Sequence, residues 1–106
     1  MKIANTILEQ LGGNKFIAMT GSRNFIDCGN ALTMHLTTNK LKARYLKIQL
    51  NENDLYTMIF STSKKIIDNT IGIKVDQHVI LKTYNGVYCD MLSNIFEKET
   101  GLRTSL

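Results

Sequence analysis

The 106-residue chain, with 43% hydrophobic and 21% charged residues, has the size and composition of one globular domain, which excludes an intrinsically disordered protein. No apolar run approaches the roughly 20 residues that cross a bilayer. Because Glu9 and Gln10 stand where a signal peptide needs its apolar segment, we expect a cytoplasmic protein without membrane contact. The formal net charge of +4 favours acidic partners.

The N-terminal part of the chain predicts one helix and two short strands. Four apolar residues fall on one face of a helix that runs from residue 3 to residue 11, namely Ile3, Ile7, Leu8 and Leu11. Gly12-Gly13 then ends the helix, because glycine readily takes the left-handed conformation of a C-cap. The uncharged segment from Phe16 to Thr20 predicts a strand. It is expected to form a hairpin with Phe25 to Cys28 across the turn Gly21-Ser22-Arg23-Asn24.

Three segments in the middle of the chain, residues 31–37, 43–50 and 55–61, alternate apolar and polar residues with the period of half-buried strands. The loops between them are short, so we expect an antiparallel meander. The side chains expected to face the core are Leu32, Met34, Leu36, Leu46, Ile48, Leu50, Tyr56, Met58 and Phe60. The opposite face is nearly as apolar around Leu55 and Ile59.

The last third of the chain predicts a further hairpin and a helix. Ile71, Ile73 and Val75 alternate before a possible turn at Asp76-Gln77, so a hairpin that extends beyond the main sheet is expected. The helix should begin near Asn85 as its cap, with Asp90 close to the positive end of its dipole, and end at Gly101. Its expected buried stripe consists of Val87, Met91, Leu92, Ile95 and Phe96.

These elements together predict an α+β fold in a single domain, residues 1–106. We expect an N-terminal helix, an antiparallel meander of four to six strands and a C-terminal helix. Both helices are expected to cover one face of the sheet, since each has one apolar stripe to bury. The other face would then be open to solvent or to a partner.

Residues with catalytic chemistry are few and scattered. His35 and His78 lie in different predicted strands and in no catalytic motif. An offset of seven residues places Cys28 and His35 on opposite faces of any continuous strand. Neither Cys28 nor Cys89 belongs to a metal-ligand pattern. We therefore expect a protein that is not an enzyme and that has reduced cysteines, no metal and no cofactor.

The basic residues are distributed more unevenly. Residues 28–51 contain no acid and four bases, which equal the formal net charge of +4, and Arg23 adds a further base in the preceding turn. The candidate residues for contact with nucleic acid or another anion are Arg23, Lys40, Lys42, Arg44, Tyr45 and Lys47. Two simpler interpretations stay open. The lysines can be ordinary solvent-face residues, and the turn at Gly21 can serve only to reverse the chain.

The two ends of the chain resemble a family of small proteins from bacteriophages and integrated mobile elements. LGGNKFIAMTGSRNF, residues 11–25, is similar to the family pattern LGG-x-x-F-x-AMTGAKNF, and GVYCDMLSNIFEKETGLRTSL, residues 86–106, is similar to GVYAD-x-L-x-x-x-F-x-x-x-TGLYTSL. This chain has Ser22-Arg23 in place of Ala-Lys, Cys89 in place of Ala and Arg103 in place of Tyr. The resemblance implies a phage-type origin and the cytoplasm of a host cell. It assigns no activity and no catalytic residue.

Two functional hypotheses follow from these observations. The first is a non-enzymatic small binding protein of phage type that contacts nucleic acid through a basic sheet face. The second is a protein-interaction factor, either self-associating and structural or an inhibitor of a host enzyme or defence system, with homo-oligomers as one form. Apolar residues around Leu55 and Ile59 support the second hypothesis, because open apolar faces and sheet edges bind other chains.

Overall fold

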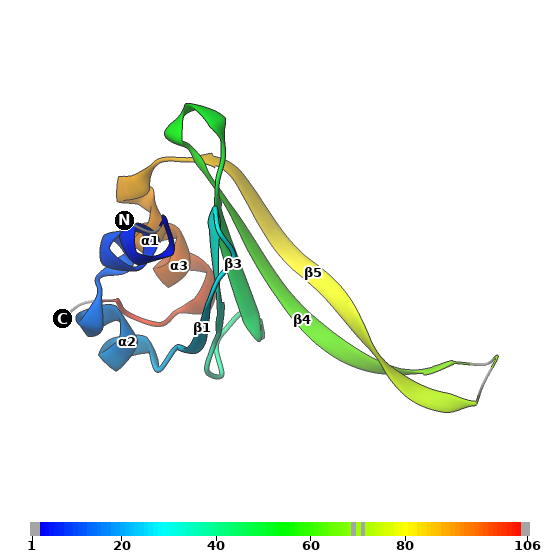
Figure 1. The fold of residues 1–106 in the computed structure, drawn as a ribbon. Coiled ribbons are helices and arrows are strands. Elements are labelled where there is room, and N and C mark those ends of the chain that lie inside the picture. Colours follow the sequence, from blue (N-terminus) through cyan, green and yellow to red (C-terminus); the bar gives the residue numbers. More distant parts are fainter. Residues whose placement is uncertain (1–2, 69, 71, 105–106) are drawn as a thin grey trace.

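The computed structural model describes residues 3–68, 70 and 72–104 and confirms the predicted α+β fold (Figure 1). In this part of the chain five antiparallel strands pair in the order of the sequence, as expected for a meander. The strands are β1 (Arg23–Asp27), β2 (Ala31–His35), β3 (Tyr45–Leu50), β4 (Tyr56–Asp68) and β5 (Ile73–Val87). The helices are α1 (Ile3–Leu11), α2 (Asn14–Thr20) and α3 (Leu92–Thr100), with short 3₁₀ turns at Glu52–Asp54 and Cys89–Met91.

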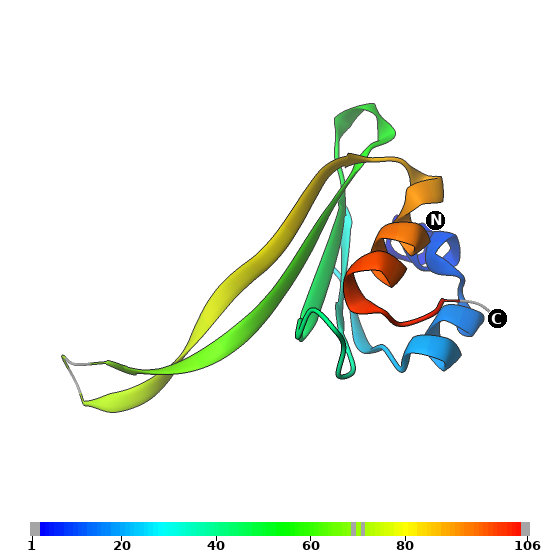
Figure 2. The ribbon, with the colours of Figure 1, turned by 180° about the vertical axis from the view of Figure 1, so that it is seen from behind.

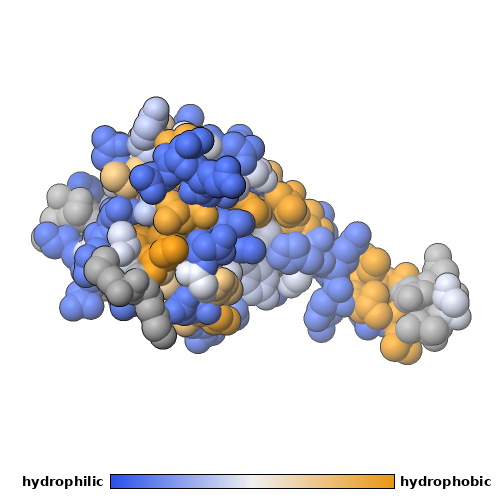
Figure 3. All heavy atoms as spheres, turned by 45° about the horizontal axis from the view of Figure 1, so that its top comes forward, coloured by the Kyte–Doolittle hydropathy of each residue, from blue (hydrophilic) through white to orange (hydrophobic). Residues whose placement is uncertain are grey.

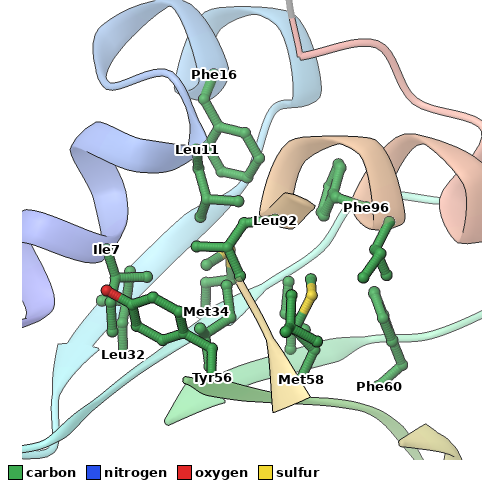
Figure 4. Packing of buried hydrophobic residues seen from close by; sticks show 14 of the residues in the cluster. Ile7, Leu11, Phe16, Leu32, Met34, Tyr56, Met58, Phe60, Leu92 and Phe96 are labelled. Carbon is green, nitrogen blue, oxygen red and sulfur yellow. The ribbon is translucent and has the colours of Figure 1, made fainter. Parts of the chain in front are cut away.

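All three helices lie on one face of the sheet (Figures 1 and 2), so the prediction that the N-terminal and C-terminal helices cover the same face is confirmed. The core forms between the helices and the inward residues of β2, β3 and β4 (Figure 4). Its fully buried side chains include Ile7, Leu11, Phe16, Met34, Leu46, Ile48, Met58, Phe60, Leu92 and Phe96. The period-two pattern therefore identified the buried face of each central strand correctly. We call the sheet face opposite the helices the open face.

The strand predicted at Phe16 to Thr20 is wrong, because this segment is helix α2. Phe16 and Thr20 are one helical turn apart and both are buried, and the Thr20 hydroxyl donates to the Phe16 carbonyl at 2.7 Å. The Phe16 ring packs edge-on against Phe96, with 5.0 Å between ring centroids. The predicted hairpin across Gly21 is also wrong, since β1 pairs with β2. Contacts between distant segments thus override a local pattern that fits a strand equally well.

Strands β4 and β5 form one long hairpin, and the predicted turn at Asp76-Gln77 is wrong. Asp76 and Gln77 lie within β5 opposite Lys65 and Lys64. The chain reverses between the end of β4 at Asp68 and the start of β5 at Ile73, and the predicted alternating position Ile71 lies outside the described residues.

Strand β3 pairs with β4 only as far as Ser61, so the outer part of the hairpin has no third strand beside it. We call residues 62–68 and 73–79 the arm. It projects beyond the sheet, as the sequence suggested (Figure 1). The radius of gyration of 14.8 Å exceeds the value of about 13 Å typical for this chain length, in agreement with a projecting arm.

The C-terminal helix begins later than predicted. Asn85 is no helix cap but a residue of β5, where its side-chain carbonyl accepts a hydrogen bond from Thr57 at 3.2 Å. Helix α3 runs from Leu92 to Thr100, and Gly101 is confirmed as its left-handed C-cap. The Tyr84 hydroxyl donates to the Glu99 carboxylate and joins β5 to α3, and this bond raises the pKa of Tyr84. Met91, which was expected in the buried stripe of this helix, is 41% exposed.

Candidate functional site

The strand register brings basic and aromatic side chains from three strands together on the open face. Arg23 on β1 lies opposite His35 on β2, which in turn lies opposite Tyr45 on β3. Directly opposed residues of antiparallel strands point to the same face. Lys47 follows Tyr45 by two residues and faces the same way. Arg23 and Lys47 therefore share the open face.

A β-bulge near the start of β1 sets the position of Arg23. Arg23 and Ile26, three residues apart, lie opposite His35 and Thr33, which are only two residues apart. The extra residue is accommodated where Asn24 has a positive φ of 55°. The Asn24 side-chain amide donates to Nδ1 of His35 at 3.0 Å and so orients the imidazole.

The segment Gly21-Ser22-Arg23-Asn24 connects a helix to a strand and does not form an anion-binding loop of free amides. Gly21, with φ 67°, caps α2 through a hydrogen bond from its amide to the Ile17 carbonyl. The Ser22 amide donates to the Thr20 hydroxyl at 3.3 Å, and the Ser22 side chain is buried. Both amides are thus engaged within the protein. The group of this segment that can contact an anion is the exposed Arg23 guanidinium.

Three of the predicted basic residues line one hollow of about 540 Å³ at the end of the open face, which we call the basic hollow. It is lined by Arg23, Lys42 and Arg44, together with His35, Tyr45 and residues 36–39 and 43. None of these lining residues is acidic. The loop that supplies Lys42 and Arg44 is held by buried Asn39, whose side chain donates to the carbonyls of Thr37 and Ala43 at 2.7 Å each.

The two remaining candidate residues, Lys47 and Lys40, lie in different parts of the structure. Lys47 lies on the open face beyond Tyr45, outside the lining of the basic hollow. Lys40 lies toward the helices instead, because its amide donates to the Thr100 carbonyl at 2.9 Å and its side chain lies beside Gly101. The structure therefore brings five of the six predicted residues to the open face or its rim and places Lys40 elsewhere.

The rings of two histidines, His35 and His78, flank the Tyr45 ring. The His35 ring contacts Tyr45 edge-on at 4.9 Å between centroids, and the His78 ring lies 6.4 Å from Tyr45 with the two planes 31° apart. A correct strand register predicts the first pair, because His35 lies opposite Tyr45. The second pair depends on how the β4–β5 hairpin crosses the open face, which no local pattern indicates.

A second hollow of about 620 Å³ adjoins the basic hollow, and the two share His35 and Tyr45. We call it the apolar hollow. Its lining consists of Ile26, Thr33, Met34, His35, Tyr45, Leu46, Lys47, Ile59, Ser61, Ser63, Asp76, His78 and Ile80. Ile26 and Ile80 are more than half exposed here. Hence the open face offers a cationic site directly beside an apolar one with polar side chains at its edges.

Other reactive side chains lie apart from one another. Cys28 and Cys89 are exposed free thiols, and the Cys28 sulfur lies 4.0 Å from the Thr33 hydroxyl. Within residues 3–68, 70 and 72–104, no three His, Cys, Asp or Glu side chains gather in a group able to hold a metal ion. Among the helices of this same part of the chain, none has the length and apolar character needed to cross a membrane.

Comparisons of this chain with protein-family models, with curated proteins and with solved structures find no match.

Proposed function

We propose that this chain is a non-enzymatic binding protein, of the bacteriophage type that its termini resemble, and that it contacts nucleic acid through the open face. The observation that carries the proposal is the meeting of Arg23, Lys42 and Arg44 around one hollow beside the rings of His35 and Tyr45. These residues come from β1, from β2, from the loop between β2 and β3, and from β3. Their separation along the chain supports a shared surface rather than a run of solvated lysines.

The chemistry of the basic hollow suits phosphate. A guanidinium binds phosphate oxygens in pairs, and two arginines with one lysine provide a positive field that draws a polyanion. A neighbouring aromatic ring can also stack on a base, so this surface suits a nucleic acid better than a ligand that offers only phosphate. The opposite side of the sheet cannot bind a ligand in this way, because apolar side chains of the core fill it.

Removing the three charges of the basic hollow tests the proposal. The triple variant Arg23→Gln/Lys42→Gln/Arg44→Gln should weaken binding to a labelled single-stranded oligonucleotide about 30- to 100-fold near 100 mM salt, because about three neutralised phosphates are lost. The slope of log affinity against log salt, which is negative, should become less steep by about 2. Fluorescence anisotropy across a salt series measures both quantities.

The matched control is Lys15→Gln/Lys98→Gln/Arg103→Gln, which alters three exposed bases on α2, on α3 and after α3. Both triple variants lower the formal net charge from +4 to +1. The control should retain most of the affinity, since its residues lie in the helix layer. Equal losses in the two variants would show that net charge alone attracts the oligonucleotide and would contradict a site on the open face.

The arm favours protein–protein interaction as the second candidate function. Ile66, Ile67 and Ile73 are 41%, 62% and 57% exposed, and apolar atoms gather toward the end of the arm (Figure 3). An isolated two-stranded hairpin is only marginally stable in water, so a partner that covers these residues would stabilise the arm. A second copy of the chain is the simplest such partner.

Self-association through the arm predicts a concentration-dependent mass in analytical ultracentrifugation. The variant Ile67→Thr/Ile73→Thr keeps β-branched residues in both strands and should shift the protein to the monomer. Ile26→Thr/Ile80→Thr makes the same two changes at exposed isoleucines outside the arm and should leave the mass unchanged. A wild-type protein that stays monomeric at about 100 μM, where weak interfaces associate, would rule out this form of the second candidate.

A further inference from the structure

The rings of Tyr45 and His78 form an aromatic pair at the surface of the apolar hollow, which both residues line. Their centroids are 6.4 Å apart and their planes are 31° from parallel, within the range of about 4.5–7 Å in which aromatic side chains contact each other directly. Aromatic side chains at a protein surface are the groups on which the bases of single-stranded nucleic acids stack.

The surroundings of this aromatic pair suit a nucleobase. Tyr45 and His78 both line the apolar hollow, where Ile59 and Ile80 provide apolar contact and the hydroxyls of Ser61 and Ser63 can pair with polar base edges. The His35 ring packs edge-on against Tyr45, and the hydrogen bond from Asn24 orients His35. The tyrosine ring is thus positioned before any ligand arrives, which lowers the entropy lost on binding.

The charges on either side of Tyr45 give the ligand a direction. The basic hollow with Arg23, Lys42 and Arg44 adjoins Tyr45 on one side and contains no acid in its lining. The apolar hollow on the other side contains one basic residue, Lys47, and one acidic residue, Asp76, so its lining has no net charge, and the Asp76 carboxylate can accept a hydrogen bond from a base N–H group. Phosphates therefore fit the first hollow and an uncharged base fits the second.

We propose that the open face binds single-stranded nucleic acid, with one unpaired base in the apolar hollow, stacked against the aromatic pair of Tyr45 and His78, and the adjoining phosphates in the basic hollow. This inference rests on the proposed function and specifies its ligand. A base within a duplex is stacked on its neighbours and paired, so it cannot enter the apolar hollow without being extruded. The site should consequently prefer single strands to duplexes of the same length.

The test compares two labelled probes of about ten nucleotides, oligo-dT and an oligomer with the same phosphates in which the bases are absent. Wild-type protein should bind oligo-dT about tenfold more tightly than the abasic probe, because stacking adds to the electrostatic attraction. Tyr45→Leu and His78→Leu should each reduce this ratio toward one, whereas Tyr45→Phe should keep it.

Each outcome bears on a different statement. Loss of the ratio in both leucine variants, with binding of the abasic probe unchanged, supports the stacked base. A ratio that persists in folded His78→Leu, or a duplex that binds as tightly as oligo-dT, overturns the inference and leaves nucleic-acid binding itself intact. Absence of binding to every probe at low salt overturns the proposed function. Because His78 is exposed, its variant should fold even if Tyr45→Leu does not.

Discussion

Phe16→Ala is expected to lower the free energy of unfolding by about 3–5 kcal/mol, the cost of removing a fully buried aromatic ring from a packed core. Phe16 is the residue through which α2 reaches the core, and its ring packs edge-on against Phe96 of α3 (Figure 4). Because small domains have total stabilities of about 5–15 kcal/mol, a large part of the stability should be lost. Urea unfolding followed by circular dichroism measures the change.

Lys15→Ala is the control for Phe16→Ala, since Lys15 is the neighbouring residue of α2 and is exposed. Its effect should stay within about 0.5 kcal/mol, as for most surface substitutions. If the segment were the strand that its sequence suggests, Ile17 would alternate with Phe16 and bury the opposite face. A loss for Phe16→Ala no larger than that for Lys15→Ala would contradict the helix and its docking against α3.

The parts of the fold that could be predicted are those in which one face of an element is buried along its whole length. Leu46 and Ile48 alternate with exposed or half-buried residues because helices cover one side of β3. The buried positions are therefore apolar at every second residue, and this period of two is visible in the sequence. The segment 16–20 carries no charge and fits a helix or a strand equally well. Its state is decided by Phe96, a residue far along the chain.

The position of the hairpin turn was missed for a related physical reason. The arm is uncovered on both sides beyond Ser61, so no burial pattern separates strand residues from turn residues there. Asp76-Gln77 looks like a turn by composition, but in the structure Asp76 lies opposite Lys65, a pairing of opposite charges that suits a strand.

The candidate site could be predicted from charge but only in part. The acid-free window indicated Lys42, Arg44 and Lys47, and alternation places Lys47 beside Tyr45 on the open face. Lys42 and Arg44 lie in the loop before β3, so their position beside Arg23 depends on the course of that loop. The inclusion of Arg23 depends on the bulge at Asn24, and the approach of His78 depends on the crossing of the long hairpin. Both are set by strand pairing between distant segments, which no single segment specifies.

Gly21→Ala is expected to destabilise the protein by about 2–5 kcal/mol, because two separate costs combine at this position. The left-handed backbone, with φ 67°, costs a residue with a Cβ about 1–2 kcal/mol. In addition, a Cβ at Gly21 would lie 2.8 Å from the Thr37 methyl group, and overpacking of this kind costs about 1–3 kcal/mol. Thr37 has little freedom to move away, since its hydroxyl donates to the Thr20 carbonyl at 2.8 Å.

Gly101→Ala separates the two costs, since Gly101 caps α3 with nearly the same backbone angles, φ 75° and ψ 0°, against φ 67° and ψ 15° at Gly21. A Cβ at Gly101 would meet the Lys40 side chain at 3.5 Å, an ordinary contact. Its loss should therefore be only the backbone term of about 1–2 kcal/mol. A second variant, Gly21→Ala/Thr37→Ser, removes the crowding methyl group and should recover the difference between the two glycines. Equal losses at Gly21 and Gly101 would show that the helix cap alone, and not the close approach of Gly21 to Thr37 in the loop after β2, requires glycine at position 21.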